Sequence, residues 1–184
     1  MTHFNLKKYL TMDVQQYKKL VPANFADNSR VWIYQSNRRF NNEEAAGVVS
    51  HLTQFVCGWK SHGTTVKGFA DLYYEQFIVI IADESAAAVG GCSTDSSVHV
   101  IKMIESQYSV NLFDRQLLAF EINDQIKLLP LSQLKISVED GIINENTLYF
   151  NNTIANKIEL INDWILPVKT SWLSGRLNFS SVVS

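Results

Sequence analysis

A run of five large apolar residues, Phe77-Ile78-Val79-Ile80-Ile81, limits the folds open to this chain more than any other stretch. Its length fits a strand, its β-branched residues favour one, and neither face carries a polar residue. A strand of this kind is buried on both sides, so we expect it at the centre of a sheet. The other elements are predicted to pack around it.

The segments on either side of this run alternate between strand and helix patterns. Strand patterns cover residues 31–35, 65–74, 76–82, 116–122 and 125–129, and helical spacing covers residues 42–59 and 97–108. The order from residue 31 to residue 122 is that of the ferredoxin-like split βαβ fold, βαββαβ. We therefore predict an α+β, ferredoxin-like fold: an antiparallel sheet with both helices on one face and additional N- and C-terminal helices.

The length of 184 residues fits a single domain, and no repeat, low-complexity tract or linker divides the chain. We expect an N-terminal helix and link in residues 1–30 and the βαββαβ core with one extra strand in residues 31–130. A helical extension is expected in residues 131–184. The extra strand follows Asn123-Asp124, a favourable hairpin turn, and His62-Gly63 is predicted to end the first core helix.

The charges nearly balance, which bears on the partners of the protein. The chain has 16 Lys and Arg residues and 18 Asp and Glu residues, a net charge of −2, and no basic run stands out. A nucleic-acid partner is therefore not expected. The first residues lack the apolar core of a signal peptide, and no stretch is long and apolar enough to span a bilayer. We expect a cytoplasmic protein without a membrane partner.

The polar, glycine-led stretch from Gly90 to Ser97 is expected to form a loop before the second core helix. A helix start offers free N–H groups and a positive dipole end, so it can hold a small anion or favour the thiolate of Cys92. Such an anion site would use Gly91, Ser93, Thr94, Asp95 and Ser96. In the alternative interpretation, Asp95 or Ser96 simply caps the helix and Cys92 is a small buried apolar group.

Two arginines are candidates for binding an anion beside that loop by forked hydrogen bonds. Arg38 follows the first strand, and its alternative role is in a solvated loop or in a salt bridge to Glu43 or Glu44. Arg115 precedes the fourth core strand next to Asp114, and such a pair can instead tie down a turn.

A second hypothesis makes the protein a cysteine-dependent enzyme of acyl or thiol transfer. Only Cys57 and Cys92 occur, both expected as thiols, and no Cys or His spacing resembles a zinc site, so no metal and no cofactor are expected. Catalysis would need His62 to deprotonate Cys92 and a carboxylate, Asp83 or Asp95, to orient the imidazole. In the alternative interpretation, His62 is a capping or hydrogen-bonding residue.

Five stretches together resemble an uncharacterised bacterial family, typical of Bacteroidetes, that is sometimes labelled "ABC transporter ATPase". They are Trp32 to Arg38, Trp59 to Gly63, Gly91 to Ser97, Phe113 to Arg115 and Phe150 to Asn152. The resemblance covers most of the chain and implies no role for any residue. The sequence lacks the Gly-x-x-x-x-Gly-Lys-Ser/Thr phosphate loop, which speaks against ATPase activity.

The preferred prediction is a non-catalytic binding or interaction protein that holds a small anionic ligand, or a carboxylate of a protein partner, at the Gly90 to Ser97 loop with Arg115 or Arg38 nearby. The enzyme hypothesis above is the first alternative. A homodimer formed through an exposed sheet edge is the second.

Overall fold

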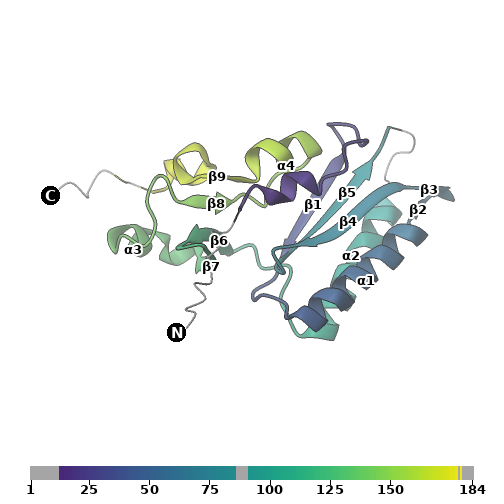
Figure 1. Cartoon of the computed structure of the whole chain (residues 1–184), viewed down its shortest axis with the longest axis horizontal. Helices are drawn as coiled ribbons and strands as arrows, with labels where there is room; N and C mark the ends of the chain where they lie inside the picture. Colours follow the sequence, from purple (N-terminus) through teal and green to yellow (C-terminus); the bar gives the residue numbers. More distant parts are fainter. Residues whose placement is uncertain (1–12, 86–90, 178, 180–184) are drawn as a thin grey trace, which may run out of the picture.

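The structure is a computed structural model that describes residues 13–85, 91–177 and 179, and the side chains of these residues except residues 91–93. It contains two antiparallel sheets, one of three strands and one of four, and a short two-stranded hairpin. Figure 1 shows the three-stranded sheet next to helices α1 and α2, with the four-stranded sheet at the other end of the molecule. An α+β fold is thus confirmed.

The three-stranded sheet is built around β5 (Phe77–Asp83). β5 lies between β1 (Arg30–Gln35) and β4 (Lys67–Tyr73) and is antiparallel to both. All seven of its residues are buried, which confirms the central position predicted from its apolar run. Tyr74 and Glu75 join β4 to β5 with positive φ angles of 54° and 49°.

The two faces of β5 belong to two different cores. Its even-numbered residues pack with residues of α1 (Asn42–Gly58) and α2 (Gly91–Tyr108). Phe77, Val79 and Ile81 pack against Trp164 and other residues near α4 (Lys157–Asp163), on the opposite side of the sheet (Figure 1). The second core also includes Tyr17 from a short 3-10 helix, Gln16–Lys19, the described part of the predicted N-terminal helix.

The four-stranded sheet has the order β7-β6-β8-β9. Its strands are β6 (Leu117–Ile122), β7 (Gln125–Pro130), β8 (Leu148–Phe150) and β9 (Ile165–Pro167). Asn123 and Asp124 form the β6–β7 turn with φ angles of 55° and 59°, which confirms the predicted hairpin. A third core joins this sheet to α3 (Leu134–Glu139) and to the short helices Leu131–Gln133, Val168–Thr170 and Trp172–Gly175.

The finer ferredoxin-like topology is not confirmed. β1, α1, β4, β5 and α2 follow one another as predicted, with the sheet order β1-β5-β4. The strand after α2, β6, pairs with β7 and β8 instead of β1. Pairing β6 with β7 closes only a two-residue turn, which costs little chain entropy. The outer edge of β1 therefore remains open along part of its length.

Helix α1 begins at residue 42, as predicted, and ends slightly earlier than predicted. Its N-cap is Asn41, which forms a capping box with Glu44. The helix ends at Gly58, and His62-Gly63 is the turn between β2 (Lys60–Ser61) and β3 (Thr64–Thr65), with φ angles of 49° and 84°. Positive φ at both positions is typical of a type I′ hairpin turn, so the glycine serves this turn and not the helix end.

The described part of the predicted Gly90 to Ser97 loop is helical. Residues 91–97 form the first turns of α2, and Gly90 lies outside the described residues. The Ser97 hydroxyl donates to the Thr94 carbonyl oxygen at 2.7 Å, so this polar side chain is satisfied within the helix. Burial of the apolar face at Ile101 and Ile104 outweighs the weak helix propensity of the first turns.

Candidate functional site

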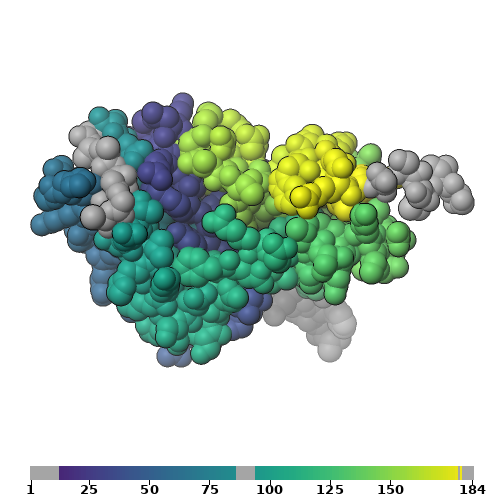
Figure 2. Space-filling model, turned by 180° about the vertical axis from the view of Figure 1, so that it is seen from behind, coloured from purple at the N-terminus to yellow at the C-terminus, as the bar shows by residue number. Residues whose placement is uncertain are grey.

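A cavity of about 400 Å³ lies along the open edge of β1, and we call it the β1 cavity. All six β1 residues line it. Its other walls are residues 112–115, 117 and 118, which lead from α2 into β6, and residues 152–155, which precede α4, together with Tyr149 and Trp172. Figure 2 shows this side of the molecule, where the purple N-terminal part of the chain lies between the teal segment of α2 and the yellow-green segment of α4.

Hydrogen bonds close the β1 edge at both ends of the cavity. At one end, the Val31 N–H donates to the Ala155 carbonyl oxygen at 2.9 Å. At the other end, the Gln35 side-chain amide donates to the Leu117 carbonyl oxygen at 2.9 Å. Ile33 lies between these two closures and lines the cavity.

A chain of side-chain hydrogen bonds fixes the wall near Gln35. The buried Trp164 indole N–H donates to the Asn152 side-chain oxygen at 3.0 Å, and the Asn152 amide donates to the Gln35 side-chain oxygen at 2.9 Å. Gln35 then donates to Leu117, as described above. Each amide in this chain donates and accepts, so the orientation of both side chains is set by their partners.

Arg115 supplies a positive charge to the cavity. It lines the cavity and is exposed, and within the described part of the chain its guanidinium has no hydrogen-bond or ion-pair partner. Burial raises the pKa of Tyr34, while the Ser97 hydroxyl and the Arg115 charge act in the opposite direction. Asp114 accepts a hydrogen bond from the Gln116 N–H at 2.8 Å, which confirms that it ties down the turn. Arg115 itself takes no part in that hydrogen bond.

The remaining cavity residues are largely apolar or already paired. The Arg30 guanidinium lies 4.7 Å from the centre of the Trp32 ring and 3.5 Å from the Glu84 carboxylate. Phe113 and Trp172 contribute large aromatic side chains that are 39% and 40% exposed. Partly exposed aromatic rings beside a cavity offer contact area to an apolar ligand.

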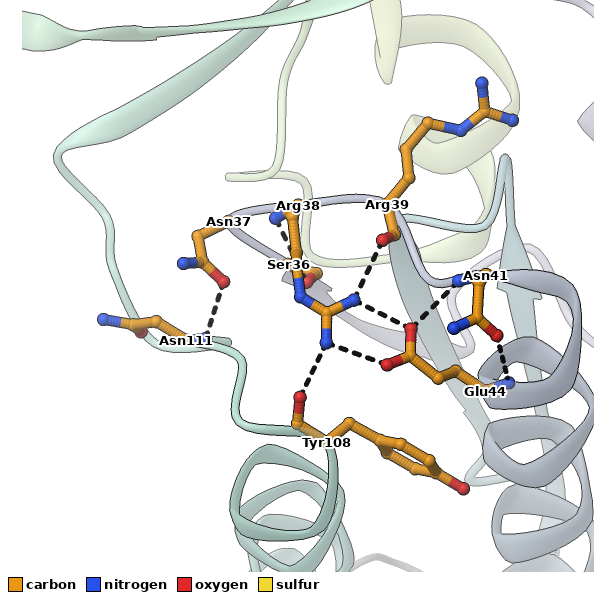
Figure 3. Close-up of polar contacts among 8 residues, drawn as sticks. All are labelled: Ser36, Asn37, Arg38, Arg39, Asn41, Glu44, Tyr108 and Asn111. Carbon is orange, nitrogen blue, oxygen red and sulfur yellow. Dashed lines mark hydrogen bonds and ion pairs between the residues drawn. The ribbon is translucent and has the colours of Figure 1, made fainter.

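Arg38 lies in a different cluster, shown in Figure 3. Its guanidinium donates to both carboxylate oxygens of Glu44, at 2.7 and 2.9 Å, and to the carbonyl oxygens of Tyr108 and Arg39, at 2.7 and 3.1 Å. Glu44 also accepts from the Asn41 N–H at 2.9 Å. We call these five residues the Arg38 cluster. It joins the β1–α1 loop to the end of α2, which confirms the predicted alternative, a salt bridge to Glu44.

The hydrogen bonds of the Arg38 cluster change the acidity of Glu44. Arg38 and the Asn41 N–H both stabilise the charged carboxylate and together lower the pKa of Glu44 from 4.5 to about 2. Arg38 is thus engaged by protein groups and does not line the β1 cavity.

The three residues of the enzyme hypothesis lie on separate elements. His62 is exposed in the β2–β3 turn, and Cys92 lies in the first turn of α2 with its side chain outside the described set. The Asp83 carboxylate accepts from the Lys67 ammonium at 2.6 Å and from the Ser85 N–H at 3.1 Å. These bonds hold the pKa of Asp83 well below its usual range. The described partners of Asp83 are therefore Lys67, Ser85 and the Ala26 N–H, not His62.

The predicted anion-site residues at the start of α2 do not line the β1 cavity. Gly91 and Ser93 occupy its first turn, Thr94 is half-buried, and Asp95 and Ser96 are exposed. Of the predicted site residues, only Arg115 lines the cavity. Ile33, Tyr34 and Asn152 were missed, because no sequence signal marked β1 as the strand with an open edge.

Comparison with known proteins found no family model, no curated protein and no solved structure that matches this chain. The resemblance to the Bacteroidetes-type family stays a prediction. No helix in the described part of the chain combines the length and apolar character needed to cross a bilayer. Among the side chains that the structure describes, no three of His, Cys, Asp or Glu gather as metal ligands.

Proposed function

We propose that this protein is a non-catalytic binding protein that holds a small anionic ligand in the β1 cavity, with Arg115 as the charged contact. The observation that carries the proposal is that Arg115 lines a cavity of ligand size and that its guanidinium has no hydrogen-bond or ion-pair partner among the described residues. Cavities of 300–1,000 Å³ with apolar walls and a few polar groups are typical ligand sites. A planar guanidinium recognises a carboxylate by two parallel hydrogen bonds.

The proposal moves the anion contact from the start of α2 to Arg115. The exposed Asp95 carboxylate would repel an anion at that helix start. Arg38, the other predicted contact, already binds Glu44. The aromatic walls favour a ligand with an apolar or aromatic body attached to its negative group.

The test is calorimetric titration with 3-phenylpropanoate, a carboxylate with an aromatic body. Arg115→Ala is expected to weaken binding roughly 10- to 100-fold, the range for loss of a charge-assisted hydrogen bond. The matched control is Arg39→Ala, because Arg39 is exposed, forms an ion pair with Glu75 and does not line the cavity. Asp95→Ala tests the anion site predicted at the start of α2, and it should leave the affinity for 3-phenylpropanoate unchanged. Equal binding by wild type and Arg115→Ala would contradict the proposal.

A further inference from the structure

The open edge of β1 places the unpaired backbone unit of Ile33 beside the cavity. In an antiparallel sheet, successive residues of a strand direct their N–H and C=O groups to opposite sides. The Ser36 N–H donates to Gln76, next to β5, whereas the Val31 N–H points outward to Ala155. Ile33 is in phase with Val31, so its N–H and C=O face away from β5. Neither group of Ile33 has a hydrogen-bond partner among the residues that the structure describes.

We propose that the ligand of the β1 cavity is an N-acylated amino acid, whose secondary amide and carboxylate pair with the free edge at Ile33 while Arg115 binds the carboxylate. Pairing at Ile33 requires one donor and one acceptor side by side, which a secondary amide followed by a carboxylate provides. This inference deepens the proposed function and rests on it, because it uses the same cavity and the same arginine.

The geometry limits the ligand to about one or two residues. Val31 and Gln35 are four residues apart, and a strand rises about 3.3 Å per residue, so the edge between them spans only ~13 Å. Both ends of that span are closed by Ala155 and Leu117. A cavity of about 400 Å³ is also near the lower limit for ligand sites. A longer peptide strand cannot extend the sheet here.

The charges in the cavity favour one negative group. Arg30 is engaged by Glu84 and by the Trp32 ring, so Arg115 is the cation available to a ligand in the described cavity wall. The Asp114 carboxylate lies on the same wall and opposes a second anionic group. The partly exposed Phe113 and Trp172 rings suit an apolar side chain.

The test compares three probes that differ at the amide. N-acetyl-L-phenylalanine carries the N–H, 2-acetoxy-3-phenylpropanoate replaces it with an ester oxygen, and 3-phenylpropanoate has neither. We expect N-acetyl-L-phenylalanine to bind about tenfold more tightly than the ester, the effect of one lost hydrogen bond that leaves a carbonyl unpaired. In NMR spectra, the Ile33 amide proton should shift downfield when the amide probe binds.

The outcomes separate this inference from the proposed function. Equal affinities for the three probes, with Arg115 still required, would overturn amide recognition and leave the anion site standing. Failure of all three probes to bind would overturn both. Tighter binding of an acetylated hexapeptide ending in phenylalanine would overturn the limit on ligand length.

A backbone variant gives an independent measurement. Ile33→Pro removes the N–H, which lies on the open edge where proline is tolerated, and it should weaken N-acetyl-L-phenylalanine binding about tenfold. Circular dichroism establishes whether the variant is folded. The comparison of amide and ester on the wild-type protein decides the question if it is not. A folded Ile33→Pro variant with unchanged affinity would contradict the inference.

Discussion

The Arg38 cluster and the β1 cavity use arginine in opposite ways. Arg38 lies where a loop, the start of α1 and the end of α2 meet, and it donates to Glu44 and to two carbonyl oxygens. Arg115 follows Asp114, whose carboxylate is taken by a backbone N–H, and no described acceptor reaches its guanidinium. An arginine saturated by protein acceptors holds elements together, whereas an open one is available for recognition.

The largest loss of stability is expected from removing the Trp164 side chain, which supports the wall of the β1 cavity. Trp164 is fully buried, packs against Tyr17 and Phe77, and donates to Asn152 in the cavity wall. Trp164→Ala should lower the free energy of unfolding by about 3–5 kcal/mol. Denaturant titration measures this loss. The matched control, Trp172→Ala, removes a ring that is 40% exposed and should lower the free energy of unfolding clearly less. Equal losses for the two variants would show that Trp164 does not support the cavity wall more than Trp172 does.

A smaller effect is expected from breaking the amide chain of the cavity. Gln35→Leu leaves the Asn152 amide without its acceptor and the Leu117 carbonyl without its donor. We expect a loss of about 1–3 kcal/mol in the free energy of unfolding, the cost of unsatisfied polar groups. The control is Gln125→Leu, on the exposed end of β7. A loss no larger than that of the control would mean that water replaces both bonds at no cost.

The two arginines themselves give the sharpest comparison. Arg38→Ala should lower the melting temperature, because it removes hydrogen bonds that link the β1–α1 loop to α2. Arg115→Ala should leave the melting temperature nearly unchanged and reduce ligand binding instead. Thermal denaturation measures the melting temperature of both variants, and calorimetric titration measures their ligand binding. Destabilisation by Arg115→Ala equal to that by Arg38→Ala would remove the distinction between the two clusters.

The smallest effect is a pH dependence confined to the Arg38 cluster. The pKa of Glu44 is lowered from 4.5 to about 2 in the folded protein, so its contribution to stability is fully present above about 4.5 and is lost as the pH falls toward 2. Wild type should therefore be more stable than Glu44→Gln at pH 7, and the difference should shrink between pH 4.5 and 2. A difference that stays constant down to pH 2 would show that the carboxylate charge contributes nothing.

Local patterns predicted much of the fold. The apolar run of β5, the helical spacing of α1 and the Asn123-Asp124 turn each depend on neighbouring residues, and each lies close to where it was expected. The helical spacing of residues 97–108 likewise lies within α2. Whether β6 pairs with β1 or with β7 and β8 is not encoded in any local sequence pattern. The start of α2 was placed too late, because tertiary burial decides whether weak helix formers join a helix.

The candidate site was only partly accessible to sequence reasoning. Arg115 was singled out by its residue type and its place before a strand, and it lines the cavity. Ile33 carried no signal, since its proposed role belongs to the backbone and depends on β6 leaving the edge of β1 open. Arg38 and Arg115 could not be told apart, because the acceptors that engage Arg38 include a carbonyl oxygen 70 residues away.

The short open length of β1 also bears on solubility. Exposed sheet edges can recruit strands from other copies of a chain and begin aggregation. Here the Val31 N–H is already bonded to Ala155 at one end, and the Gln35 side chain is bonded to Leu117 at the other. A strand from another copy therefore finds no continuous row of free peptide groups with which to pair. The open length of β1 is thus too short for a strand of another copy to pair along it.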